Sequence, residues 1–188
     1  MSDSTVAGPS RLLVCDDTEA NRYSVVRHLR AQGFAVSEAG TGRDAIERIT
    51  ADLPDLVILD IRLPDISGLE VTRRLRENPR TANIPILHIS ASFTDTASKA
   101  RGLDNGADGY LTHPVDPPVM LATVRALLRA HAAEREVAEA ERQWSVTFNA
   151  IADGVCVTDQ VGRLLRCNRA FEELLGFKCE EGDTRPVW

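Results

Sequence analysis

The sequence predicts an α/β protein with a doubly wound, five-stranded parallel sheet, and two patterns carry this prediction. Short apolar runs of strand length alternate with amphipathic stretches of helix length from Arg11 to His131. Two of the runs, "DLVILD" at 55–60 and "IPILHIS" at 84–90, are apolar almost throughout. Such runs are typical of central strands, because the crossover helices of a parallel sheet cover both of its faces.

The expected elements follow one another with a turn or cap signal at most junctions. Gly33 and Gly106 end two helices, Pro79 stops a third, and Pro117 lies in the first turn of the last, where proline is tolerated. The strands are expected at residues 11–17, 34–39, 55–60, 84–90 and 109–112. The helices are expected at residues 19–33, 42–52, 68–78, 95–106 and 117–131. This alternation favours the flavodoxin-like strand order 2-1-3-4-5.

Two of these helices show their periodicity clearly. In "EANRYSVVRHLRAQG", Tyr23 and Val26 recur at helical spacing with Leu29. In "GRDAIERITAD", Ala45, Ile46 and Ile49 are the residues that we expect to turn inward.

Polar side chains gather where the expected strands end. Asp16 and Asp17 close the first strand and Asp60 the third, while Ser90 and His113 end the fourth and fifth. The first and third strands would be neighbours at the switch point of the sheet, where ligands bind outside the carboxyl ends. Converging carboxylates repel one another unless a cation neutralises them, and oxygen ligands with open positions suit Mg²⁺. A lone Asp would more simply cap a helix, but three at converging ends favour a functional site.

Residues 10–130 resemble a response-regulator receiver domain through the motifs "LLVCDDTEANR", "DLVILDIRLPDISGLEV", "IPILHISAS" and "GADGYLTHPVD". The resemblance implies that Asp60 is the phosphoacceptor, attacking a phosphohistidine of a sensor histidine kinase or a phosphotransfer protein. It also implies a Mg²⁺ ion that Asp17 and Asp60 bind directly and Asp16 binds through water. The backbone carbonyl of Arg62 would be a further ligand.

The same resemblance assigns two switch residues. Ser90 would hydrogen-bond the phosphoryl group after transfer, and Tyr110 would change rotamer as Ser90 moves. Phosphorylation adds a charge of about −1.5 to −2 at pH 7, which can pull a hydroxyl inward and bias a two-state face. The resemblance further suggests a cis peptide bond between His113 and Pro114.

His113 departs from the family pattern, because receivers usually carry a lysine before this proline. A histidine is shorter, and at pH 7 it is only partly charged unless its neighbours change that. Three interpretations stay open: a protonated His113 substitutes weakly for the ammonium group, a neutral His113 leaves a slow or poorly switching site, or His113 is structural. In the last case the domain would be a pseudo-receiver that serves as an interaction or dimerisation module.

A competing motif is "GTGRDA" at 40–45, which fits the GxGxxA pattern of a dinucleotide-binding turn and precedes an acid, Asp60. It follows the second expected strand and not the first, and no second mononucleotide-binding half follows it. We therefore interpret its glycines as a strand-to-helix turn. None of the histidines begins the acidic-apolar motif of a kinase phosphoacceptor, and we recognise no kinase catalytic region in the sequence.

From Val119 to Ala150 the sequence has neither Pro nor Gly, which predicts a long helix. At 1.5 Å per residue it would reach roughly 45 Å, more than the last helix of a receiver needs. We expect residues 131–143 to be a helical linker. It is either a solvated connector or, through residues 116–150, part of a parallel coiled coil that makes a homodimer; its Ala-rich, polar core positions favour the dimer.

Residues 144–188 resemble the start of a PAS domain, with "AIADGVCVTD" and "GRLLRCN" as strands and "NRAFEELLGF" as the following helix. The match covers part of such a domain, so the segment would be loosely folded, paired across a dimer, or a short variant. Cys156 and Cys167 are expected to be packed thiols, and we expect no haem or flavin.

Composition argues against several other classes. The net charge of −6 speaks against nucleic-acid binding through phosphate contacts. No apolar run approaches the ~20 residues of a membrane span, and residues 1–9, expected to be a flexible tail, lack the features of a signal peptide. The cysteines form no CxxC pair, which favours a reduced, cytoplasmic protein. The sequence thus predicts a phosphoryl-accepting receiver that catalyses its own phosphotransfer and signals through a helical linker to a PAS module.

Overall fold

The computed structural model describes residues 8–90 and 106–176, and the chain divides into two compact units after His131. The helix expected at 95–106 and most of the expected tail at 1–9 lie outside the described residues. None of the helices in the described part of the chain is long and apolar enough to cross a bilayer.

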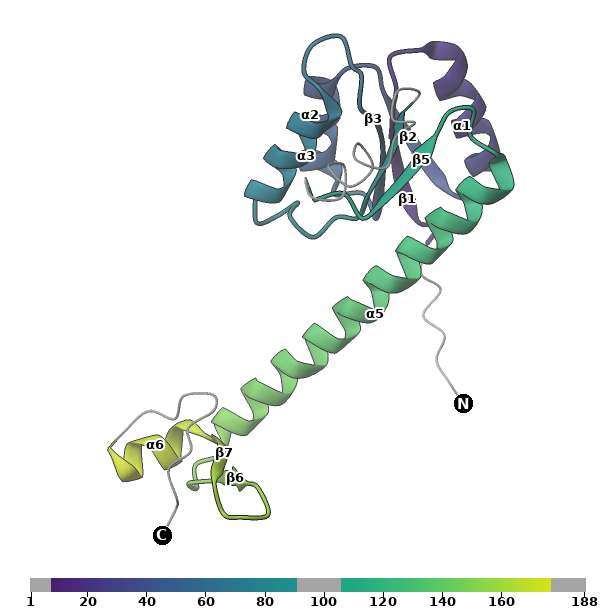
Figure 1. Cartoon of the computed structure of the whole chain (residues 1–188). Coiled ribbons are helices and arrows are strands. Elements are labelled where there is room, and N and C mark those ends of the chain that lie inside the picture. The colour runs from purple at the N-terminus through teal and green to yellow at the C-terminus, as the bar shows by residue number, and fades with distance from the viewer. Residues whose placement is uncertain (1–7, 91–105, 177–188) are drawn as a thin grey trace. The chain divides into compact units, whose positions relative to one another are not determined.

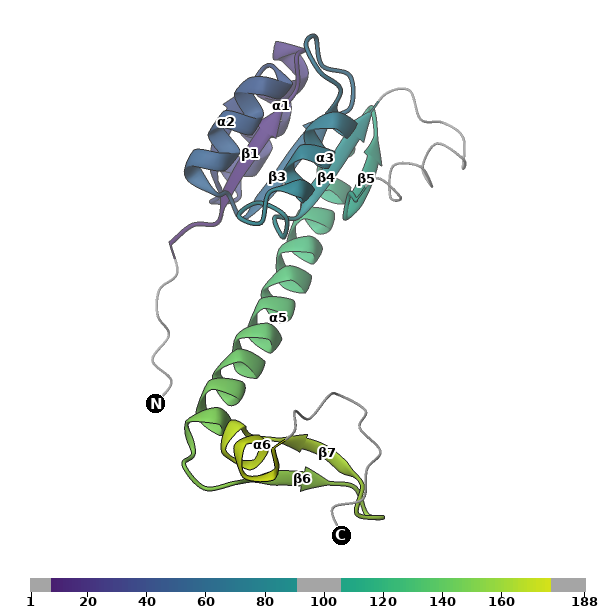
Figure 2. The same ribbon diagram turned by 90° about the vertical axis from the view of Figure 1, so that its left-hand side faces the viewer.

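The first unit is built on a five-stranded parallel sheet with the order β2-β1-β3-β4-β5. Figure 2 shows β1, β3, β4 and β5 following one another across it. The strands are β1 (Arg11–Cys15), β2 (Ala35–Ala39), β3 (Leu56–Asp60), β4 (Ile86–Ser90) and β5 (Gly109–Thr112). The predicted fold class and strand order are confirmed, and β3 and β4 are buried nearly throughout, as expected for central strands.

Helices cover both faces of this sheet (Figure 1). The described helices of this unit are α1 (Glu19–Ala31), α2 (Gly42–Asp52), α3 (Gly68–Glu77) and the first part of α5 (Pro117–Ala150). On one face α2 and α3 enclose a cluster of buried side chains that includes Leu13, Ile49 and Leu75. On the other face α1 and α5 enclose a second cluster, with Leu29 and Val124 against the strands. The sheet is therefore held rigidly between two apolar layers.

One exposed side chain of α1 lies at the same helical spacing as its buried residues. Tyr23, which shares the helical spacing of Val26 and Leu29, is 64 % exposed, whereas Val25 is buried beside them. A tyrosine at the edge of an apolar face can turn its ring to solvent, and periodicity alone does not exclude that.

The second unit contains the rest of α5, the antiparallel strands β6 (Cys156–Thr158) and β7 (Leu164–Cys167), and α6 (Arg169–Leu175). The strand predicted from "AIADGVCVTD" is shorter than expected, because residues 151–155 do not join the sheet. In this stretch the carbonyls of Ile151 and Asp153 accept hydrogen bonds from the side-chain amide of Asn168. A side chain, and not a neighbouring strand, satisfies these two carbonyls.

Asn168 connects the parts of the second unit, since its side chain is fully buried and takes part in four hydrogen bonds. Its Oδ1 accepts from the N–H of Val155 at 2.8 Å and from the N–H of Phe171 at 3.0 Å. Its Nδ2 donates to the carbonyl oxygens of Ile151 at 3.2 Å and Asp153 at 2.8 Å. One residue therefore caps α6 and ties the end of α5 to β7.

Candidate functional site

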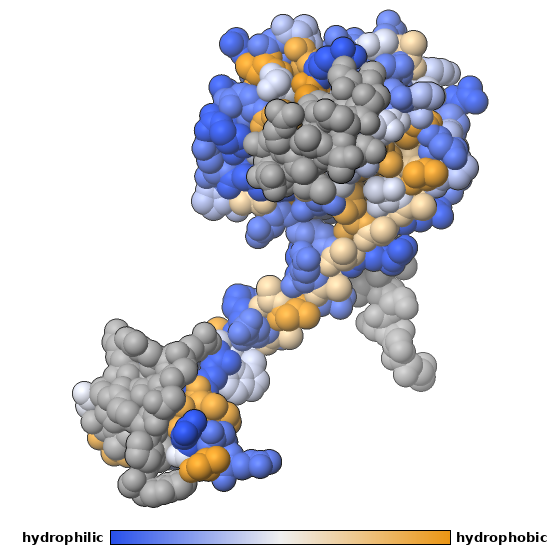
Figure 3. Space-filling view, viewed as in Figure 1, coloured by the Kyte–Doolittle hydropathy of each residue, from blue (hydrophilic) through white to orange (hydrophobic). Residues whose placement is uncertain are grey.

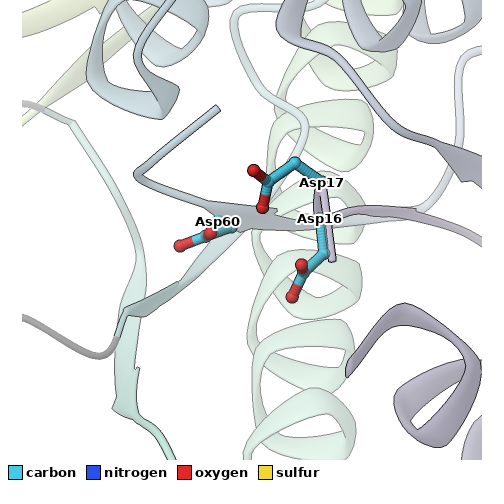
Figure 4. A group of neighbouring side chains, drawn as sticks. All are labelled: Asp16, Asp17 and Asp60. Carbon is cyan, nitrogen blue, oxygen red and sulfur yellow. The ribbon is translucent and has the colours of Figure 1, made fainter. Parts of the chain in front are cut away.

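Three carboxylates converge at the carboxyl ends of β1 and β3, as Figure 4 shows. Asp16 and Asp17 follow β1 directly, and Asp60 is the last residue of β3. One oxygen from each of the three carboxylates lies within 4.8 Å of the others. The parallel pairing of β1 with β3 produces this arrangement, because it brings the ends of two strands to one edge of the sheet.

Backbone contacts fix the segment that carries Asp16 and Asp17. The Oδ1 of Asp16 accepts from the N–H of Thr18 at 2.8 Å, which forms a tight turn before α1. The carbonyl of Asp16 accepts from Arg22 Nη1 at 2.6 Å. Asp16 is thus buried with one carboxylate oxygen committed to the protein, while Asp17 is exposed to solvent.

The surroundings of the cluster disfavour its negative charge. Burial raises the pKa of Asp60, the N–H groups of Arg62 and Ile61 oppose that rise, and the charge of Asp16 adds to it. Burial likewise raises the pKa of Asp16, against the hydrogen bond from Thr18. A divalent cation bound by oxygen ligands would relieve this repulsion, so the donor set fits Mg²⁺.

An open cleft of about 630 Å³ adjoins the carboxylates. Its walls come from the ends of β1, β3 and β5, the strands whose ends were predicted to carry the site. The cleft is lined by Asp17, Thr18, Asn21, Asp60, Arg62, His113 and Pro114. Arg62 therefore lies where it was expected, beside Asp60; the role of its carbonyl as a ligand stays a prediction.

His113 lies at the edge of the cluster, and the peptide bond to Pro114 is cis, as expected. Its Nε2 is 3.9 Å from Oδ2 of Asp16. That separation is too long for a hydrogen bond, and Nε2 has no hydrogen-bond partner in the described structure. The ring is close enough to form an ion pair with Asp16 when it is protonated.

Ser90 and Tyr110 lie on the neighbouring strands β4 and β5. Ser90 is fully buried, and its carbonyl accepts from the N–H of His113 at 3.1 Å, which links it to the proline turn. Tyr110 is half-buried, and burial raises the pKa of its hydroxyl; an interaction with Ser90 works in the opposite direction, and the charge of Asp60 adds to the rise. Both predicted switch residues thus lie near the acid cluster.

Asp65, in the loop after β3, has a role that sequence reasoning missed. Its two carboxylate oxygens accept from the N–H groups of Gly42 and Arg43, at 2.8 and 2.9 Å. Desolvation opposes its charge, but these amides outweigh it and lower the pKa of the carboxyl to about 2. The "GTGRDA" turn therefore binds a carboxylate of the protein, which agrees with its interpretation as a strand-to-helix turn. No signal in the sequence pairs Asp65 with this turn.

Gly68, at the start of α3, was also missed, although it lies within a motif quoted for the resemblance. Its N–H donates to the carbonyl of Ile61 at 2.8 Å. A Cβ atom at this position would lie 2.3 Å from the carbonyl oxygen of Asp60 and 2.9 Å from Cα of Ile61. Only a glycine lets α3 approach the backbone of the central acid this closely.

The first unit matches a known protein family. The family model of the response regulator receiver domain matches residues 12–125, more than half of the chain. The chain belongs to the response regulator receiver family. A second family model, that of a PAS domain, matches residues 142–188 after the receiver.

Curated relatives of the receiver include regulators of different lengths. Response regulator MprA of Mycolicibacterium vanbaalenii is 34 % identical over 90 % of this chain and 80 % of its own length. The phosphate regulon regulatory protein PhoB of Rhizobium meliloti is 40 % identical over 63 % of this chain and 52 % of its own. Response regulator PleD of Caulobacter vibrioides is 38 % identical, and the chain spans 26 % of it.

Solved structures agree with the receiver fold. The chemotaxis response regulator CheY4 of Vibrio cholerae matches with a TM-score of 0.60 and 28 % identity, covering 63 % of this chain and 98 % of that one. The receiver domain of the Francisella response regulator 1452 matches with a TM-score of 0.61 and 26 % identity, covering 64 % and 98 %.

Proposed function

We propose that Asp60 accepts a phosphoryl group from a phosphohistidine in a Mg²⁺-dependent, self-catalysed reaction. The observation that carries the proposal is the convergence of three carboxylates beside an open cleft in a receiver domain. A carboxylate oxygen of Asp60 attacks phosphorus, the phosphorus–nitrogen bond of the donor breaks, and the imidazole leaves with the electron pair. The product is an aspartyl phosphate.

The residues around Asp60 have separate tasks in this reaction. Asp16, Asp17, Asp60 and the carbonyl of Arg62 would hold Mg²⁺, which when bound neutralises charge on the transferring group. The N–H of Arg62 orients the carboxylate of Asp60, since it already donates to it. Their fixed positions on the sheet supply most of the remaining catalysis through alignment.

We further propose that Ser90 and Tyr110 form the switch. Ser90 is buried at the carboxyl end of β4 and is linked through its carbonyl to the turn that holds His113. A phosphoryl group on Asp60 would offer new acceptor oxygens to the hydroxyl of Ser90. Movement of Ser90 would then free space for the ring of Tyr110 on the adjacent strand.

The signal would pass from the receiver at 10–130, which follows a tail at 1–9, into the helical linker at 131–143. From the linker it would reach the PAS module at 144–188. We propose that residues 116–150 support a homodimer in this process. Val137 and Val146 on α5 are 68 % and 61 % exposed, and Figure 3 shows apolar residues interspersed with hydrophilic ones along this helix. Such a mixed surface suits an adjustable contact better than a tight zipper.

The partner in phosphotransfer would be a histidine kinase or phosphotransfer protein of the cytoplasm, with no nucleic acid bound.

The alternative function, a pseudo-receiver that only docks or dimerises, rests on His113. Its Nε2 lies 3.9 Å from Asp16 and makes no hydrogen bond, so an imidazole reaches less far than the lysine usual at this place. If His113 does not balance the negative charge of the phosphoryl group, phosphoryl transfer would be slower or the switch weaker.

Labelling with acetyl phosphate separates the two functions. The wild-type chain is expected to gain one phosphoryl mass with Mg²⁺ and none with excess chelator. Asp60→Asn should abolish the gain, and Asp52→Asn, at an exposed acid at the end of α2, should leave it intact. His113→Lys should raise the rate. No label on the wild type together with strong label on His113→Lys would favour the pseudo-receiver.

A further inference from the structure

Two cysteines face each other across the hairpin of the second unit. Cys156 on β6 and Cys167 on β7 are directly opposed in the antiparallel register, on the strands drawn side by side in Figure 2. The N–H of Asn168 donates to the carbonyl of Val155 at 2.9 Å, so the pair before them is a hydrogen-bonded one. Because the two kinds of pair alternate, Cys156 and Cys167 occupy a non-hydrogen-bonded position.

That position matches the geometry of a disulfide. In a non-hydrogen-bonded pair the two Cα atoms are about 4.5 Å apart, and both side chains project from one face of the sheet. Disulfides span Cα separations of about 4.4 to 6.8 Å. The backbone would therefore accept the bond with little movement.

The two thiols are also accessible, in contrast to Cys15. Cys156 and Cys167 are half-buried, and neither belongs to a disulfide in the structure. Cys15 is buried in β1, and burial, with the charge of Asp16 adding, raises the pKa of its thiol to about 12. Cys15 is thus inert at neutral pH and serves as an internal reference for reactivity.

We propose that Cys156 and Cys167 form a reversible disulfide, which makes the hairpin a redox-sensitive site whose co-reactant is a small-molecule disulfide. One thiolate attacks a sulfur of the small disulfide, and the first small thiolate leaves. The second protein thiolate attacks the mixed disulfide, the protein disulfide forms, and a second small thiolate leaves. Each leaving thiolate takes up one of the two protons that the cysteines release.

The strand register favours attack by the second protein thiol on the mixed disulfide over attack by another small molecule from solution. The second thiol is held opposite the mixed disulfide, so ring closure is intramolecular. The product joins strands that are short, and an isolated two-stranded hairpin is marginally stable in water. In a reducing compartment such a bond would be transient and regulatory.

Peptide mapping tests the pair in the whole chain. Reduced protein is incubated with oxidised glutathione, the remaining thiols are alkylated under denaturing conditions, and the protein is digested with trypsin. Cleavage at arginine separates Cys156, in peptide 143–163, from Cys167, in peptide 167–169, and leaves Cys179 in a third peptide. We expect the first two peptides to be cross-linked, with the loss of two hydrogen atoms and of both alkyl groups, while Cys15 is alkylated.

Two variants make the outcome specific. Cys179→Ser should keep the cross-link, and Cys156→Ser should lose it and carry glutathione on Cys167 instead. Excess dithiothreitol should reverse the bond in the wild type. Alkylation of both cysteines after oxidation, glutathione on both, or a link from Cys167 to Cys179 would each overturn the proposal. The result does not depend on phosphoryl transfer at Asp60.

Discussion

The receiver unit and the C-terminal unit are held together by different kinds of contact. In the receiver, two clusters of buried apolar side chains lie on either side of the sheet. In the described part of the C-terminal unit, the buried apolar side chains are Phe148 and Leu164, and the fully buried one is polar Asn168. The receiver is stabilised by apolar area removed from water, whereas the C-terminal unit depends on a few directional hydrogen bonds.

This difference matches the chemistry of the site that each unit carries. The acid cluster needs oxygens fixed to fractions of an ångström, and the sheet supplies that rigidity. The cysteine pair lies on a short hairpin whose own stability is small, so a single covalent bond can change it substantially. A close backbone contact and a buried histidine in the receiver, and one buried asparagine in the C-terminal unit, allow the two kinds of stabilisation to be changed separately.

The largest effect is expected for Gly68→Ala in the receiver. The new Cβ would meet the backbone of Asp60 at 2.3 Å, so α3 or the end of β3 must move. We expect a loss of about 4 kcal/mol or more in unfolding free energy, and loss of acetyl phosphate labelling. Gly40→Ala is the matched control, because its nearest neighbour is a side-chain atom of Arg22 at 3.8 Å. Equal urea midpoints for the two variants would show that the close approach is not needed.

The next effect is expected for Asn168→Ala in the C-terminal unit. Four hydrogen bonds disappear, and the N–H of Val155 and the carbonyl of Asp153 lose the side chain that satisfies them. We expect a cost of about 3 kcal/mol, confined to this unit. Hydrogen exchange should accelerate in β6, β7 and α6 and stay unchanged in the receiver strands. Asn149→Ala, which removes two exposed bonds, one from the N–H of Arg169 and one to the carbonyl of Ser145, should change little. Faster exchange throughout the receiver would contradict the separation of the two units.

A smaller, pH-dependent effect is expected from His88 in β4. The ring is fully buried, with Nε2 2.7 Å from Oγ1 of Thr72. Burial lowers its pKa to about 4 from 6.5, and the charge of Arg76 contributes. The unfolded chain therefore binds a proton first, so this stability is full above pH 6.5 and is lost as the pH falls toward 4. Between pH 7 and pH 5 the loss should be about 2 kcal/mol.

Urea denaturation of the wild type and His88→Gln at both pH values measures this contribution. The glutamine amide can still reach Thr72 but does not titrate. The wild type should lose about 2 kcal/mol more than the variant between the two pH values. Identical pH dependence in both proteins would mean that His88 keeps its normal affinity for protons in the fold.

Much of the receiver could be predicted from its sequence, because each signal there is local or periodic. The limits of α2 and β5, the strand order and the convergence of Asp16, Asp17 and Asp60 all follow from spacing. Asp65 and Gly68 could not be predicted, since their importance lies in contacts with the backbone of other elements that no pattern encodes.

In the C-terminal unit less could be predicted. Asn168 looks like an ordinary helix cap in "RCNRAF", and only the structure shows it bonding to Ile151 and Asp153. The opposed cysteines, likewise, follow from a register that depends on where the short strands begin.

Chemical trapping of the acyl phosphate shows directly whether Asp60 accepts the phosphoryl group. After incubation with acetyl phosphate and Mg²⁺, borohydride reduces an aspartyl phosphate to homoserine, and fragmentation of tryptic peptide 49–62 locates the change among Asp52, Asp55 and Asp60. We expect homoserine at position 60 alone, and none when chelator replaces Mg²⁺. An unmodified peptide, or homoserine at another acid, would contradict it.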